Sequence, residues 1–120
     1  VLFRSGMSAI ARVLMERGEQ ISGSDLSMTP FAESLADSGV PINIGHKSEA
    51  VQGADLVLVS SAVPDSNVEL EAARTEGIPV FRRPAFLPEL VEGYRTVAVG
   101  GTHGKTTTTA MIAWILRTVA

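Results

Sequence analysis

The sequence predicts an α/β fold built on a parallel sheet, and three features carry that prediction. Segments with helical spacing alternate with short apolar segments along the 120 residues, the order that parallel sheets with crossover helices require. The segment Leu56–Ser60 is almost continuously apolar, as a strand buried on both faces should be. Near the end, the apolar segment Thr96–Val99 leads into a glycine turn that opens a helix.

The predicted helices have recognisable beginnings and ends. Over Met7–Arg17, apolar residues recur at the spacing of one helix face, and Gly18 follows. The next helix begins at Thr29-Pro30, where a capping hydroxyl precedes a proline in the first turn, and it ends before Gly39. Further helices are predicted over residues 67–76, 84–91 and 105–118.

Strands are predicted between these helices, over residues 19–24, 42–44, 56–60, 78–81 and 96–99. Ser24 and Asp25, at the end of the first of them, are expected to project beyond the sheet. A new strand–loop–helix unit begins near 92–95. We therefore expect one domain over residues 1–93 and the start of a second over 94–120.

Composition excludes several classes of function. The net charge of −3 has the wrong sign for nucleic-acid or anionic-membrane binding. Without cysteines there is no disulfide scaffold and no cysteine metal site. The most apolar stretch, Ala110–Leu116, is far shorter than the roughly 20 residues that span a bilayer. We expect a cytoplasmic protein with neither nucleic acid nor membrane as partner.

The most specific motif is the glycine turn Gly100–Gly104, which is followed by Lys105-Thr106 at a helix start. Such turns let backbone N–H groups surround phosphate oxygens, and the helix N-terminus adds partial positive charge. Lysine then reaches the terminal phosphates and the threonine hydroxyl binds Mg²⁺. The strict P-loop spacing would need glycine where Val99 stands. The alternative is a glycine turn capped by threonines.

The segment Gly101–Thr108 resembles the ATP-binding loop of the Mur ligases, the ATP-dependent ligases of bacterial peptidoglycan synthesis. His103 and the threonine run after it resemble the member that adds L-alanine to UDP-N-acetylmuramate. The resemblance implies that ATP and Mg²⁺ are the cofactors, with Lys105 and Thr106 as catalytic residues and Thr106 on the metal. It implies that the ATP-binding residues are Gly101, Thr102, His103, Gly104, Lys105, Thr106 and Thr107.

The rest of the chain resembles the first domain of that family, which is Rossmann-like and binds UDP-N-acetylmuramate. The implied contacts to this UDP-sugar are Gly6, Met7, Ser24, Asp25, His46, Ser60, Ser61 and Arg83. Asp25 lies where such folds place a ribose-binding carboxylate, roughly 20 residues past the glycine loop. The alternative for Asp25 is a turn-forming residue, and for His46 a structural one.

The first residues depart from the family pattern. Where the family has a strand and a glycine-rich loop, this chain reads Val1–Gly6 with only the last glycine in place. We interpret Val1–Ser5 as foreign sequence and the chain as an N-terminal fragment, inactive alone.

The resemblance implies ligation: ATP phosphorylates the muramate carboxylate, and the amine of L-alanine attacks the acyl phosphate. One alternative is the recycling relative that adds a tripeptide to the same nucleotide. Two alternatives of another class are a fragment of a nicotinamide-dependent oxidoreductase and a nucleotide-binding module without catalysis. Lys105 argues against the oxidoreductase, which has no use for it.

Overall fold

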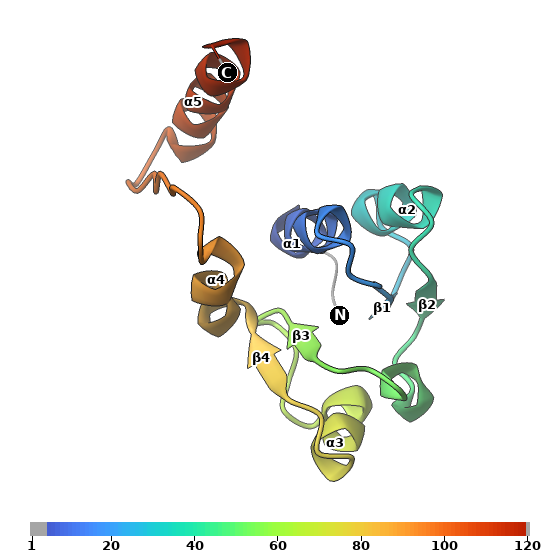
Figure 1. Cartoon of the computed structure of the whole chain (residues 1–120). Coiled ribbons are helices and arrows are strands. Elements are labelled where there is room, and N and C mark those ends of the chain that lie inside the picture. Colours follow the sequence, from blue (N-terminus) through green and yellow to red (C-terminus); the bar gives the residue numbers. More distant parts are fainter. Residues whose placement is uncertain (1–4, 120) are drawn as a thin grey trace. The chain divides into compact units, whose positions relative to one another are not determined.

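The computed structural model describes residues 5–119 (Figure 1). Its contacts divide the chain into two compact units, one ending at Leu90 and one beginning at Val91, and each is described by itself. We expected Val1–Ser5 to be foreign; residues 1–4 of that segment lie outside the described residues, and Ser5 is the first residue of a helix.

The first unit alternates helices and short strands as predicted. Its elements in chain order are α1 (Ser5–Glu16), β1 (Gly23–Asp25), α2 (Pro30–Asp37), β2 (Ile42–Ile44), the 3₁₀ turn η1 (Ser48–Val51), β3 (Val57–Val59), α3 (Val68–Thr75), β4 (Val80–Arg82) and α4 (Arg83–Val91). The second unit contains α5 (Lys105–Val119). The turn η1 was not predicted.

Two helix starts show the capping chemistry that fixes them. The Thr29 hydroxyl accepts the amide hydrogen of Ala32 at 3.2 Å, and Pro30 is the first helical residue of α2. The Asn67 side chain accepts the amide of Glu69 at 2.9 Å and begins α3. Both caps satisfy an amide that has no partner inside its own helix, which confirms the predicted starts.

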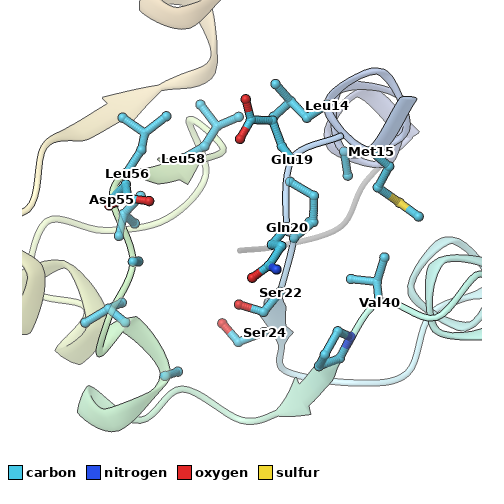
Figure 2. Close-up of a pocket in the computed structure, with 18 of the residues that line it drawn as sticks. Leu14, Met15, Glu19, Gln20, Ser22, Ser24, Val40, Asp55, Leu56 and Leu58 are labelled. Atoms are coloured by element: carbon cyan, nitrogen blue, oxygen red, sulfur yellow. The ribbon is translucent and has the colours of Figure 1, made fainter. Parts of the chain in front are cut away.

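The strands pair in parallel, as the alternation predicts, but they form two pairs. Strand β1 pairs with β2, and β3 pairs with β4 (Figure 1). Within residues 5–119 no ladder joins β1 to β3. A cavity of about 950 Å³ lies between them, with Ser22 and Ser24 on one side and Leu56 and Leu58 on the other (Figure 2). In doubly wound sheets one further strand occupies this place.

The buried apolar residues form two cores. The first packs α1 and α2 together around Met7, Ile10, Leu35 and Phe86. The second packs η1 and α3 against β3 through Val51, Val59 and Leu70. Leu58 of β3 and Phe81 of β4 also pack against the first core, so apolar contacts connect the two strand pairs.

Three predictions about strands were wrong. Residues 19–22 are irregular, so the first strand is shorter than expected. Ser24 and Asp25 lie inside β1, opposite Asn43 and Ile44, rather than beyond the sheet. Residues 96–99 form no strand. A strand exists only with a hydrogen-bonded neighbour, and the described part of the second unit contains only a helix.

Helix α5 has no buried residue, and Trp114 is 72% exposed. Its apolar side chains cover most of its circumference, as in a helix that is meant to be enclosed. None of the helices in the described range is both long and apolar enough to cross a bilayer.

Candidate functional site

The carboxyl ends of β1 and β2 bring two of the predicted site residues together. Parallel pairing places the end of β1 beside the end of β2, and His46 follows β2 by two residues. The Ser24 hydroxyl lies 3.2 Å from His46 Nδ1. Ser24 is 2% exposed, whereas His46 keeps part of its side chain accessible. At this edge, His46 is therefore more accessible than Ser24.

Both residues meet a third that the sequence analysis did not single out. Glu69, in the first turn of α3, accepts the Ser24 hydroxyl hydrogen at 2.6 Å, and its carboxylate lies 3.4 Å from His46 Nδ1. Its other oxygen accepts the backbone amide of Lys47 at 3.2 Å. Glu69 is 6% exposed. It thus links the ends of β1 and β2 to the helix that follows β3.

Asp25 is 1% exposed at the end of β1. Its carboxylate accepts the Leu26 amide at 2.7 Å, and its carbonyl accepts the Gly45 amide at 2.7 Å. These bonds hold the turn that leaves the strand. They fit the turn-forming alternative for Asp25.

The loop after β3 carries Ser60 and Ser61. Ser60 is 7% exposed, and its hydroxyl accepts the Ala62 amide at 3.3 Å. Ser61 is exposed. Arg82, the last residue of β4, donates to the carbonyls of Ser60 at 3.2 Å and Val63 at 2.8 Å. Ser60 therefore shapes the loop, and Ser61 is the hydroxyl open to a ligand.

Asp65 anchors the far end of this loop. Its carboxylate forms ion pairs with the guanidinium groups of Arg82 at 2.8 Å and Arg74 at 2.9 Å. The hydrogen bond from Arg82, followed by that from Arg74, lowers the pKa of Asp65 below its ordinary value of 3.8.

Gly6 and Arg83 approach each other closely, although 77 positions separate them. A Cβ atom placed on Gly6 would lie 3.3 Å from Arg83 Cζ and closer still to Nη1. The guanidinium therefore lies against the first turn of α1, whose free amides carry partial positive charge. Met7 contributes differently, since its side chain is 3% exposed within the first core.

The glycine turn of the second unit is exposed and ends where α5 begins, at Lys105. Gly101 and Gly104 have φ of 143° and 77°, a region that favours glycine. Lys105 Nζ donates to the Gly101 carbonyl at 2.7 Å, so the ammonium lies over the turn. Thr102, His103, Thr106 and Thr107, next to Lys105 in the sequence, are all exposed.

Residues 5–95 match the family described as "Mur ligase family, catalytic domain". The chain belongs to the Mur ligase family.

Relatives of this Mur ligase chain include UDP-N-acetylmuramate–L-alanine ligases. It is 52% identical to that of Methylococcus capsulatus over 93% of the chain, and 48% identical to that of Rubrobacter xylanophilus over 94%. It spans about a quarter of their length, 24% and 25%.

Two solved structures share the fold. The UDP-N-acetylmuramate–alanine ligase of Thermotoga maritima matches with a TM-score of 0.88 and 37% identity, over 93% of this chain and 26% of that one. A murein peptide ligase of Psychrobacter arcticus matches with a TM-score of 0.84 and 38% identity, over 94% and 24%. The α/β fold predicted from the sequence is thereby confirmed.

Sequence reasoning missed Glu69 and Arg82 in this Mur ligase chain. Each is a charged residue placed immediately beside a predicted element boundary, after the Asn67 cap or at the end of a strand. This position at an element boundary is the feature of the sequence that could have indicated a role for them. Their partners lie 45 and 17 positions away, and only the fold shows them.

Proposed function

We propose that this chain is the nucleotide-binding part of an ATP-dependent ligase that joins L-alanine to UDP-N-acetylmuramate in peptidoglycan synthesis. The observation that carries the proposal is the identity of about half of all residues to ligases of that name, over more than nine-tenths of the chain. In this proposal residues 1–93 bind the UDP-sugar, and residues 94–120 begin the domain that binds ATP.

The UDP-sugar would lie along the carboxyl ends of the strands, where open α/β sheets bind ligands. His46 is partly exposed there and Ser61 is exposed, while Ser24, Asp25 and Ser60 stabilise the strand ends and the loop. Arg83 and the first turn of α1, around Gly6 and Met7, suit the diphosphate, because a helix N-terminus and a guanidinium both bind phosphate oxygens.

ATP fits the turn that precedes α5. The left-handed glycines Gly101 and Gly104 turn the backbone as phosphate-binding loops do, and Lys105 already lies over the turn. Thr106 would hold Mg²⁺, with Thr102, His103 and Thr107 around the phosphates. When bound, ATP supplies the phosphoryl group that activates the muramate carboxylate, so that the amine of L-alanine forms the amide and phosphate leaves.

The alternative within the family is the ligase that adds a tripeptide. The murein peptide ligase structure is as similar to this chain as the alanine ligase structure, at 38% and 37% identity. The curated relatives at 46–52% identity favour alanine.

Phosphate release by a full-length ligase carrying this segment tests the proposal. With UDP-N-acetylmuramate, ATP and Mg²⁺ present, we expect release on addition of L-alanine and not on addition of the tripeptide. Release with the tripeptide alone would establish the alternative. Absence of both release and UDP-N-acetylmuramate binding would refute ligation.

A further inference from the structure

We propose that Glu69 is a positioning residue that fixes the tautomer of His46, so that His46 Nε2 presents a hydrogen-bond acceptor to the nucleoside part of the ligand. The inference rests on the proposed function for the identity of that ligand. The tautomer of His46 does not depend on that ligand, because it follows from the contacts among Ser24, His46 and Glu69.

The three side chains form a directed chain of hydrogen bonds. Glu69 Oε2 accepts the Ser24 hydroxyl hydrogen at 2.6 Å, which is short, as bonds to a carboxylate are. With its hydrogen committed, the Ser24 oxygen can only accept from His46 Nδ1, 3.2 Å away. Glu69 Oε2, at 3.4 Å from Nδ1, also presents an acceptor to this nitrogen.

Nδ1 therefore carries the hydrogen, and in the neutral ring Nε2 is the acceptor. The second carboxylate oxygen of Glu69 also fixes the side chain, since Oε1 accepts the Lys47 amide at 3.2 Å. The side chains of His46 and Glu69 are only 12% and 8% exposed. Water therefore competes little with this arrangement.

An acceptor at Nε2 suits a donor on the nucleoside. Uracil offers one ring N–H, and the ribose offers hydroxyl hydrogens. If Nε2 carried the hydrogen, two N–H donors would face each other at the uracil, and no hydrogen bond could form between them. Competition with UDP-N-acetylmuramate distinguishes the uracil donor from the ribose donor. Compared with UDP, 3-methyl-UDP lacks the uracil N–H, and 2′-deoxy-UDP lacks the 2′-hydroxyl. We expect one of the analogues to bind about tenfold more weakly than UDP in the parent enzyme.

Glu69→Gln tests the direction of the chain without changing its shape. The amide oxygen can still accept from Lys47, while the amide nitrogen faces Ser24 and donates. Ser24 would then donate to His46 Nδ1, and the hydrogen would move to Nε2. Glu71→Gln is the matched control, because Glu71 is an exposed glutamate of the same helix.

Nitrogen-15 NMR of histidine-labelled full-length ligase reads the tautomer, with His46→Ala to assign the signal. We expect hydrogen on Nδ1 in the parent and in Glu71→Gln, and on Nε2 in Glu69→Gln. Hydrogen on Nε2 in the parent overturns the proposal, even if Glu69→Gln fails to fold. This readout is independent of whether the ligand has been identified correctly.

Kinetics then test the positioning role. Glu69→Gln should raise the KM for UDP-N-acetylmuramate about tenfold, with kcat and the KM for ATP within twofold of the parent. In a His46→Ala background the same change should have no further effect, since Glu69 acts through His46. Additive effects, or an unchanged KM in folded Glu69→Gln, contradict the proposal. A parent that binds no UDP-N-acetylmuramate refutes the proposed function instead.

Discussion

The guanidinium of Arg82 lies 2.8 Å from the carboxylate of Asp65 and, through its other nitrogen, 2.8 Å from the carbonyl of Val63. Arg82 also donates to the Ser60 carbonyl at 3.2 Å, so one residue at the end of β4 holds the loop that follows β3 from Ser60 to Asp65. The loop carries Ser61, the exposed hydroxyl of the candidate site. Its conformation depends on an ion pair at the surface.

The first prediction concerns the pH dependence of this ion pair. The arginines lower the pKa of Asp65 below 3.8, so the folded state favours the charged carboxylate. Its stabilisation is therefore present above the ordinary pKa and is lost as pH falls through the lowered one. In urea unfolding of the full-length ligase, Asp65→Asn should lower the midpoint at pH 6, and the difference should shrink below pH 3.8.

Asp37→Asn is the control, because it removes the same charge at the exposed end of α2. The effect of Asp65→Asn should be small, since exposed ion pairs contribute little. A difference between parent and Asp65→Asn that grows towards low pH would contradict the assignment.

The second prediction concerns Asp25. Asp25→Asn retains an oxygen for the Leu26 amide, while it removes the charge and replaces one acceptor oxygen by a donor. Loss of a charge-assisted hydrogen bond to ribose should cost about 1.5–3 kcal/mol of binding free energy. Calorimetry should show weaker UDP-N-acetylmuramate binding by at least several-fold. An unchanged affinity would leave Asp25 as a turn residue alone.

The third prediction concerns Lys105. Lys105→Ala removes the ammonium that lies over the glycine turn, and alanine-dependent phosphate release should be abolished. Binding of UDP-N-acetylmuramate, measured by calorimetry, should remain nearly intact, because the proposed UDP-sugar site lies in the other unit. Arg117→Ala removes a cation from the last turn of the same helix and should leave turnover unchanged. Turnover near the parental rate in Lys105→Ala would refute the ATP-loop assignment.

Local chemistry made much of the fold predictable from the sequence. Caps such as Thr29 and Asn67 act within three residues, and helix faces are read directly from spacing. The strand predicted at 96–99 was wrong because strands depend on distant neighbours. Glu69 was missed for a similar reason, since its role arises only when α3 packs near the ends of β1 and β2. The assignments of individual site residues to ligands remain predictions.

The last prediction concerns the 120-residue chain expressed alone: it should bind a hydrophobic dye or aggregate, and show no ATP turnover. The cavity of about 950 Å³ between β1 and β3 leaves the inner edges of both strands without a neighbouring strand in the described part of the chain. Helix α5 adds Met111, Trp114, Ile115 and Leu116, each more than half exposed. Every large apolar side chain left in water forgoes about 1.5–3 kcal/mol, against a typical domain stability of roughly 5–15 kcal/mol.

Truncation after Arg95 separates the two causes. Removing α5 should reduce dye binding, because its apolar side chains go with it, but thermal unfolding should stay broad, because the cavity between the strand pairs remains. A sharp cooperative melt of the truncated chain would show that the cavity costs little and that α5 alone was responsible. A sharp melt of the soluble, monomeric 120-residue chain would contradict the prediction altogether.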